Sequence, residues 1–309
     1  MEFRHTTVLL KETVDIINVR PDGVYADLTT GGGGHSLEIA KRLTNGRLIC
    51  IDRDEDALRA ARERLREHLD KITFVKTNFG AAAGVLSGMG IKCDGIIADL
   101  GVSSYQIDTV ERGFSYAADS PLDMRMDRSE GTTAYELVND ADEKHLARII
   151  STYGEEKFAS RIASFICRER EKSPIETAGR LTEIIKAAIP AAARRTGGNP
   201  AKRTFQALRI EVNDELGELR SLMEDFCDML NIGGRIGIIS FHSLEDRIVK
   251  QSFVQLAKTC TCPPDMPICV CGTIPKVNII TKKAILPSEE ELLSNKRSHS
   301  AKLRAAERI

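Results

Sequence analysis

Strand-like and helix-like segments alternate over the first hundred residues, and this alternation constrains the fold more than any other feature. Four apolar runs typical of buried strands occur at residues 24–27, 48–51, 72–75 and 96–98. Segments with helical apolar spacing lie at 35–44 and 54–69. Parallel strands need crossover connections, usually helices, which cover both faces of the sheet. The segment therefore predicts an α/β fold with a parallel sheet.

The alternation stops after residue 104. Residues 105–139 are rich in loop signals, and from 140 to about 190 only helical periodicity remains, with Ile162 and Ile166 on one apolar stripe. Asn199 and Pro200 resemble a helix start. The apolar period after them predicts one long helix to about residue 230, ended by the two glycines at 233 and 234.

Strand character returns at residues 235–241. We therefore expect an all-helical domain, residues 105–210, inserted into an α/β domain. The α/β domain would comprise residues 1–104 and 211–309, and its second part would end in a basic tail at 294–309.

The charge balance limits the classes of partner. The 309 residues include 44 Lys+Arg and 45 Asp+Glu, for a net charge of −1, which excludes a globally basic coat but not a local basic patch. No apolar run approaches the ~20 residues that span a bilayer, and the N-terminal segment lacks a secretory apolar region. We expect a cytoplasmic protein without membrane contact, whose cysteines are thiols or metal ligands rather than disulfides.

A strand end, a glycine run and a helix start follow one another from Asp27 to His35 (DLTTGGGGH). Glycines allow the backbone to approach a ligand closely. The dinucleotide fingerprint is incomplete because Ser36 stands at its third glycine position. A carboxylate at Asp27 would also repel a pyrophosphate and attract a cation. S-adenosylmethionine, which carries an ammonium and a sulfonium but no phosphate, suits this loop better than a dinucleotide.

Three residues after other strands complete the predicted nucleoside site. Asp52 could accept both hydroxyl hydrogens of a ribose, or it could cap the helix at 54–69. Asp99 ends the fourth strand, where ligands bind in open α/β sheets, or it could cap the turn at Ser103. Phe79 could contact an adenine ring or belong to the core.

Two acid-poor basic segments favour contact with phosphates, although such charges are often only a solvated surface. One is the tail at 294–309. The other is residues 186–210, which contain no Asp or Glu. Its candidate RNA-binding residues are Arg194, Arg195, Lys202, Arg203 and Arg209.

Four cysteines gather within twelve residues, as Cys260, Cys262, Cys269 and Cys271. A tetrahedral zinc site with four thiolates is one interpretation. One residue between paired cysteines is tighter than the usual two to four, so a loop of free thiols is the favoured interpretation and zinc stays an alternative.

Several longer motifs resemble the RsmH (MraW) family, the S-adenosylmethionine-dependent methyltransferases of bacterial 16S ribosomal RNA. The resemblance covers nearly the whole chain. Its motifs are residues 5–12 (HTTVLLKE), 31–36 (GGGGHS), 99–104 (DLGVSS), 111–116 (ERGFSY), 121–126 (PLDMRM), 199–206 (NPAKRTFQ), 240–247 (SFHSLEDR) and 297–304 (RSHSAKLR).

The resemblance implies N4-methylation of one cytidine in the decoding centre of the small ribosomal subunit. It also implies a Rossmann-like methyltransferase sheet interrupted by a helical domain, 16S rRNA as the partner and S-adenosylmethionine as the cofactor. By motif match, the cofactor contacts would fall on Gly33, Gly34, His35, Asp52, Phe79, Asp99 and Gln106, with Asp27 beside them. A homodimer is compatible with these motifs.

The cytosine amino group is a weak nucleophile that needs positioning more than a strong base. Asp99 could accept its hydrogens, and His242 could reach the cleft or simply cap the helix that follows it. The alternatives are a methyltransferase for another RNA or protein substrate and a non-catalytic ribosome-assembly factor. The basic segment at 186–210 disfavours a small-molecule or protein substrate, and the acids Asp27, Asp52 and Asp99 disfavour a factor that has lost its cofactor.

Overall fold

The computed structural model describes residues 7–116, 119–194, 199–260, 262 and 271–309. The chain divides into two compact units: an α/β unit, which ends its first part at Gly101 and resumes at Leu216–Ile309, and a helical unit, Val102–Glu215. The helical unit begins three residues before, and ends five residues after, the insertion expected at 105–210.

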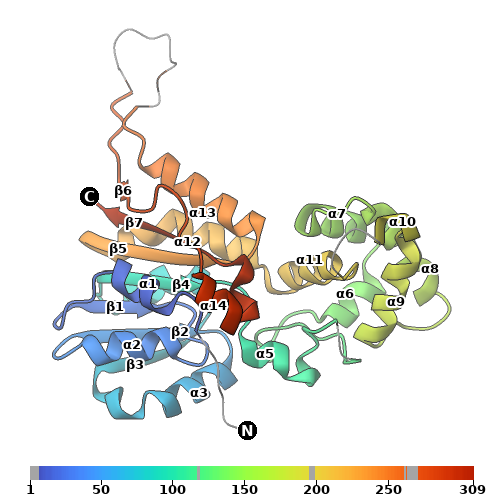
Figure 1. Cartoon of the computed structure of the whole chain (residues 1–309), viewed down its shortest axis with the longest axis horizontal. Helices are drawn as coiled ribbons and strands as arrows, with labels where there is room; N and C mark the ends of the chain where they lie inside the picture. Colours follow the sequence, from blue (N-terminus) through green and yellow to red (C-terminus); the bar gives the residue numbers. More distant parts are fainter. Residues whose placement is uncertain (1–6, 117–118, 195–198, 261, 263–270) are drawn as a thin grey trace. The chain divides into compact units, whose positions relative to one another are not determined.

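A seven-stranded sheet forms the centre of the α/β unit, in the order β3-β2-β1-β4-β5-β7-β6 (Figure 1). The strands are β1 (Val24–Asp27), β2 (Arg47–Asp52), β3 (Ile72–Lys76), β4 (Cys93–Asp99), β5 (Leu230–Ser240), β6 (Val277–Ile279) and β7 (Lys302–Arg308). The first five are parallel, while β7 is antiparallel to both β5 and β6. The predicted parallel α/β sheet is confirmed for β1 to β5.

Helices cover both faces of this sheet because successive strand residues point to opposite sides. Leu48 and Cys50 of β2 belong to the core under α1 (Leu10–Ile16), α2 (Gly34–Arg42) and α3 (Glu55–Arg64). Ile49 of β2 belongs to the core under α4 (Ala82–Gly88), α12 (Glu215–Met229) and α13 (Ser243–Leu256). There the rings of Phe226 and Phe253 meet edge to face, with centroids 5.7 Å apart, so α12 and α13 lie side by side (Figure 1).

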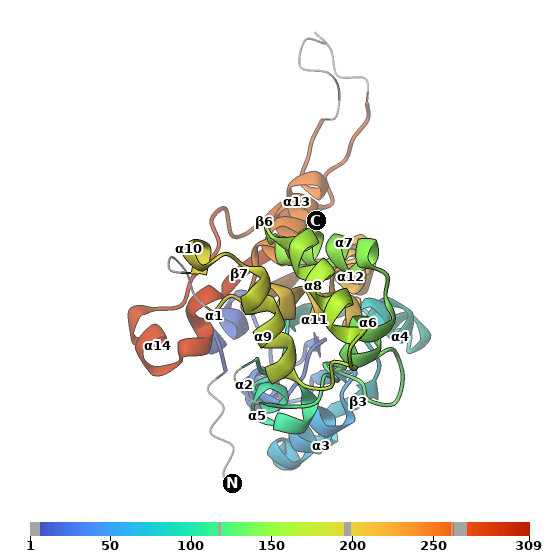
Figure 2. The same ribbon diagram turned by 90° about the vertical axis from the view of Figure 1, so that its right-hand side faces the viewer.

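The helical unit has its own apolar core. Its helices are α5 (Ser104–Asp108), α6 (Ala134–Asp140), α7 (Glu143–Gly154), α8 (Ala159–Arg170), α9 (Ala178–Ala188), α10 (Ala191–Arg194) and α11 (Lys202–Asn213). Figure 2 shows α6 to α9 and α11 packed together. The stripe predicted at Ile162 and Ile166 is fully buried in this core, beside Leu181 and Leu208.

The long helix expected from residue 200 to 230 is wrong. It is two helices, α11 and α12, separated at Asp214, which has a φ of 46°. Aspartate tolerates this left-handed conformation better than most residues, and the conformation ends α11. The two glycines expected to end the helix lie inside β5 instead. The apolar period continues across the break because both helices bury one face.

The basic tail expected at 294–309 is largely structural. Residues 302–308 are β7, inserted between β5 and β6. Arg304 donates through Nε to Asp246 Oδ1 at 2.6 Å, and the Lys302 ammonium lies 3.3 Å from Oδ2 of the same carboxylate. These two cations are therefore committed to an acid of α13. Among the described residues, no helix is both long enough and apolar enough to cross a membrane.

Candidate active site at the strand ends

The acids Asp27, Asp52 and Asp99 end three strands that are neighbours in the sheet, in the order β2, β1, β4. Asp27 is in register with Cys50 of β2 and Ile97 of β4. Asp52 and Asp99 each come two residues after those partners. Both therefore lie two residues further along the strand direction than Asp27, and their side chains point to the same face of the sheet as those of Cys50 and Ile97. The structure thus brings together the three acids that the sequence placed at one edge of the sheet.

Asp27, the last residue of β1, is the most deeply buried of the three acids and is 1% exposed. Its Oδ2 accepts a 2.6 Å hydrogen bond from the Ser36 hydroxyl, and its Oδ1 accepts from the Thr29 backbone N–H at 3.2 Å. Burial raises the pKa of Asp27 to about 7, and the Asp52 charge adds to that rise. This carboxyl can therefore act on a ligand through its charge, since its oxygens are enclosed.

Asp52 holds the glycine loop in place. The Gly31 N–H donates to Oδ2 at 2.8 Å, and the Asp54 N–H donates to Oδ1 at 2.8 Å. Gly31 and Gly33 have φ values of 51° and 75°, which glycine adopts without strain. The surrounding protein removes water from Asp52 and raises its pKa to about 6. The N-cap of α3 is Asp54, whose side chain accepts from Asp56 N–H, so that role does not fall to Asp52.

Asp99 and His35 face each other across the loop. His35 Nδ1 lies 3.8 Å from Asp99 Oδ2, and His35 Nε2 lies 3.1 Å from the Val8 carbonyl oxygen. Asp99 Oδ1 is buried, and within the described part of the chain it has no hydrogen-bond partner. The turn that follows is capped by Ser103 of the helical unit. Asp99 thus keeps one carboxylate oxygen available as an acceptor.

Further acids surround Asp99, and the sequence reasoning did not single them out. Burial raises the pKa of Asp99 well above its usual range, and the charges of Asp27, Glu245 and Glu291 raise it further. Glu291, in α14 (Glu289–Ser294), accepts the Leu9 N–H at 2.9 Å. Its long separation in sequence from Asp99 left no local signal, whereas Glu245 lies in the SFHSLEDR motif. This concentration of carboxyl groups suits a cationic ligand.

Three other predicted residues lie in a turn or at the start of a helix. Phe79 lies in the 3-10 turn η2 (Phe79–Ala81) after β3, partly buried against the α4 and α12 core. Gln106 is 4% exposed in the helical unit, where its Oε1 accepts from Ser103 N–H and completes a capping box. His242 is the N-cap of α13, and its Nδ1 accepts from Glu245 N–H at 3.4 Å. The capping alternative for His242 is therefore the one that the geometry supports.

The candidate RNA-binding residues differ in exposure. Arg194, at the end of α10, and Lys202 and Arg203, in the first turn of α11, are exposed. Arg209 is 17% exposed and donates from Nε and an Nη to the Glu215 carboxylate at 2.7 and 2.9 Å. Arg195 lies outside the described residues. The exposed cations on α10 and α11 can meet a polyanion, although Arg203 also donates through Nη1 to the Glu155 carbonyl oxygen at 3.1 Å, while Arg209 is committed to its ion pair.

Three of the four clustered cysteines are described, and the structure brings them together. The Sγ atoms of Cys260, Cys262 and Cys271 all lie within 4.8 Å of one another. Cys269 lies outside the described residues. This cluster follows α13 and precedes β6, in the same unit as the three acids.

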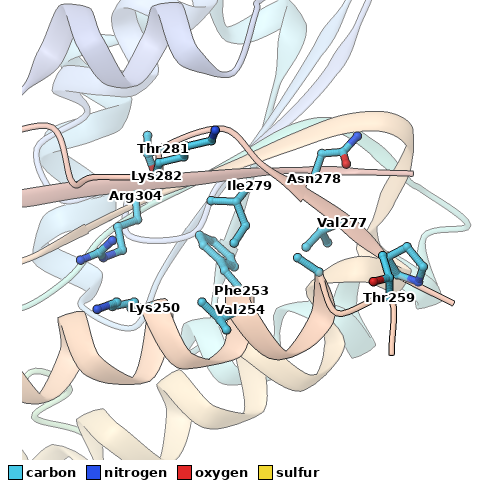
Figure 3. A pocket seen from close by; sticks show the side chains of 12 residues that line it. Lys250, Phe253, Val254, Thr259, Val277, Asn278, Ile279, Thr281, Lys282 and Arg304 are labelled. Atoms are coloured by element: carbon cyan, nitrogen blue, oxygen red, sulfur yellow. The ribbon is translucent and has the colours of Figure 1, made fainter. Parts of the chain in front are cut away.

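A pocket of about 430 Å³ lies between α13 and the last two strands of the sheet, β7 and the edge strand β6 (Figure 3). Phe253, Val277 and Ile279 give it an apolar lining. Figure 3 shows Lys250 and Arg304 at one end of this edge pocket. It is a separate feature of the α/β unit, formed at the far edge of the sheet from β1 and β2.

Comparison with known proteins decides which family has this arrangement. The model of the MraW methylase family matches residues 2–309. The chain belongs to the MraW methylase family. It is 55% identical over 311 aligned residues to "Ribosomal RNA small subunit methyltransferase H" of Brevibacillus brevis, covering 100% of this chain and 99% of the relative. It is 57% identical to "Ribosomal RNA small subunit methyltransferase H 2" of Agathobacter rectalis, with the same coverage.

Membership of the MraW methylase family agrees with the resemblance seen in the motifs, and the geometry explains two of those motifs in this chain. The GGGGHS motif supplies Gly31, whose N–H contacts Asp52, and His35, which faces Asp99. The SFHSLEDR motif supplies Glu245, which raises the pKa of Asp99, and Asp246, which anchors β7 through Arg304.

Proposed function

We propose that this protein transfers the methyl group of S-adenosylmethionine to the exocyclic amino nitrogen of a cytidine in small-subunit ribosomal RNA. The observation that carries the proposal is the set of three acids at the ends of neighbouring strands, around a glycine loop. Family membership and full-length relatives named as small-subunit rRNA methyltransferases support the substrate class. Such an enzyme would act in the cytosol, where ribosomal subunits are assembled.

The residues present fit S-adenosylmethionine. Each Asp52 oxygen takes one backbone N–H, which leaves acceptor capacity for the two hydroxyls of a ribose. Asp27 and Asp99, with Glu245 and Glu291 near Asp99, supply the negative charge that an ammonium and a sulfonium need. Phe79, at the turn after β3, is the residue we assign to the adenine side.

When bound, S-adenosylmethionine supplies an electrophilic methyl group. The chain's own task is to hold the cytosine amino group, whose lone pair is delocalised into the ring. We assign that task to Asp99, whose buried Oδ1 can accept one amino hydrogen. Accepting that hydrogen would orient the nitrogen lone pair toward the methyl group, and such positioning accounts for much of the rate enhancement in displacement reactions. As the N–C bond forms the S–C bond would break, and the amino proton would leave to solvent after transfer.

We assign RNA contact to the exposed cations Arg194, Lys202 and Arg203 of the helical unit. Lysine and arginine side chains bind phosphates without reading sequence, so these residues would supply affinity rather than choice of nucleotide. Arg209 is left out because Glu215 already neutralises it. A homodimer stays a prediction that light scattering would check.

The decisive experiment incubates the purified protein with isotopically labelled S-adenosylmethionine and small ribosomal subunits that lack the modification. Nucleoside mass analysis should then show N4-methylcytidine carrying the label. The Asp99→Asn variant, assayed beside it, should show much less. Label in a different nucleoside, or in protein only, would contradict the proposed substrate, and no label with intact cofactor binding would favour an assembly factor.

A further inference from the structure

The cysteine cluster has the dimensions of a metal site. Cys271 Sγ lies 3.8 Å from Cys260 Sγ, and the third sulfur, of Cys262, lies within 4.8 Å of both. In a tetrahedral zinc site the Zn–S distance is about 2.3 Å, which sets the S–S edge at about 3.8 Å. We infer that Cys260, Cys262 and Cys271 bind one zinc ion.

A disulfide does not account for this geometry. A disulfide bond holds its two sulfurs about 2.05 Å apart, well below the distance between Cys260 and Cys271. It would also leave the third cysteine of the cluster without a role. Zinc uses three thiolates at once, and soft sulfur ligands select zinc over magnesium or calcium.

Two hydrogen-bond donors point at the sulfurs, as expected around metal-bound thiolates. The Cys262 backbone N–H donates to Cys260 Sγ at 3.4 Å, and the Thr273 hydroxyl donates to Cys271 Sγ at 3.1 Å. Such donors outside the ligand set fix the orientation of the ligands and stabilise their negative charge.

Zinc here would join the chain where it leaves α13 to the chain where it enters β6. Cys260 and Cys262 follow α13, whereas Cys271 precedes β6. Thr259 and Pro275, which adjoin the cluster, also line the edge pocket beside α13 (Figure 3). The metal would therefore hold one wall of that pocket, a structural role distinct from the reaction at the strand ends.

Three thiolates occupy three of the four positions of a tetrahedral zinc ion. The proposed site consists of the three described cysteines; Cys269, the fourth cysteine of the zinc alternative offered by the sequence, lies outside the described residues.

The test measures metal in the full-length protein, purified without chelators from zinc-supplemented cells. Elemental analysis should find about one equivalent of zinc per chain. Cys260→Ser and Cys271→Ser should each reduce it to about a tenth or less, because removing one ligand weakens a site whose affinity depends on all of them. Cys167→Ser, a half-buried cysteine of α8 in the other unit, is the matched control and should keep the full equivalent.

Two further measurements apply to the unmodified chain, in case a variant fails to fold. Replacing zinc by cobalt should produce thiolate-to-cobalt charge-transfer absorption, and stripping the metal should speed proteolysis near residues 259–273. Zinc-free folded protein, iron in place of zinc, or a Cys260–Cys271 disulfide in freshly isolated protein would each overturn the inference. None of these measurements depends on methyl transfer. A failure of the zinc inference can therefore be distinguished from a failure of the proposed function, which the methylation assay tests.

Discussion

His35 Nδ1 lies 3.8 Å from Asp99 Oδ2, at the end of β4. The other ring nitrogen, Nε2, faces the Val8 carbonyl, which can only accept, so Nε2 carries the hydrogen. That contact orients the ring so that Nδ1 faces Asp99, at a distance longer than a hydrogen bond. Burial raises the pKa of Asp99, and the charges of Asp27, Glu245 and Glu291 raise it further, so His35 lies beside a carboxyl whose ionisation is disfavoured.

Asp99→Asn should separate catalysis from stability. It replaces one carboxyl oxygen by an NH2 group, which donates and cannot accept the amino hydrogen, so methylation should fall by about 10²-fold or more, as for other positioned acceptors. The melting temperature should stay the same or rise, more at pH 8 than at pH 5. The pKa of the Asp99 carboxyl is higher in the folded than in the unfolded protein. The free energy of unfolding therefore falls as pH rises from the unfolded pKa toward the folded one, and Asn removes that loss.

Single-turnover methylation and thermal unfolding at the two pH values check this pair of effects. Normal methylation by Asp99→Asn would show that a residue other than Asp99 accepts the amino hydrogen. A large fall in the melting temperature would mean that the Asp99 carboxylate stabilises the fold. That result would contradict the expectation from its buried Oδ1, which has no hydrogen-bond partner among the described residues.

Asp52→Ala should weaken S-adenosylmethionine binding by ~1–3 kcal/mol, the range for hydrogen bonds to charged groups. It would remove the acceptor for the ribose hydroxyls and release the Gly31 N–H. Calorimetry on the folded variant measures the change. Asp54→Ala is the matched control: it removes the N-cap of α3 and should reduce stability by ~0.5–2 kcal/mol while sparing cofactor affinity. Equal loss in both variants would mean that loop order, and not the carboxylate, sets the affinity.

Cofactor affinity should rise with pH between about 5 and 8. The pKa of Asp27 is raised to about 7 and that of Asp52 to about 6, so both carboxyls become ionised across this window. Ionisation favours a cationic ligand but lowers the stability of the ligand-free protein, because both folded-state pKa values exceed the unfolded ones. Titrations at several pH values, with proton release measured in two buffers, test this. Asp27→Asn should flatten the profile, and a flat profile in the unaltered protein would contradict it.

The strand-end acids could be predicted from the sequence because parallel strands bring their carboxyl ends to one edge. Asp27, Asp52 and Asp99 needed only the strand and helix alternation. Glu291 could not be found this way, because its contact with the Leu9 N–H joins residues 282 apart in the chain. Only the folded chain brings the Glu291 carboxylate close enough to Asp99 to raise its pKa.

Errors in the fold expectation arose where local signals were weak. In β7 the buried positions include Ala305 and Ala306, small residues that give little strand signal between charged neighbours. The break at Asp214 depends on one left-handed residue inside a continuous apolar period. Arg209 resembled a surface cation because its partner, Glu215, lies beyond that break.

Arg209→Ala should therefore reduce stability. It removes two charge-assisted hydrogen bonds from a Glu215 carboxylate that is 6% exposed, which should cost ~1.5–3 kcal/mol of unfolding free energy. Denaturant titration measures the loss. If the variant unfolds normally but loses RNA binding, Arg209 contacts RNA and the ion pair is dispensable.

Replacing Lys202 and Arg203 together by Glu tests the phosphate contact of the helical unit. Both side chains are exposed at the start of α11, and one residue of helix rotation, about 100°, separates them. Because phosphate binding releases counterions, RNA affinity should fall about tenfold or more at low salt, and the deficit should shrink as salt rises. Cofactor affinity should not change, since the strand-end acids belong to the other unit.

The matched control replaces Lys144 and Arg148, exposed residues of α7 in the same helical unit, by Glu. It makes the same change in net charge at a different surface, so a general electrostatic effect would weaken both variants equally. Subunit methylation over a salt series and a cofactor titration on the same samples distinguish these cases. Full methylation at low salt by the Lys202 and Arg203 variant would remove α11 from the RNA contact. Loss of cofactor binding alongside RNA binding would instead show that the start of α11 supports the methyltransferase fold.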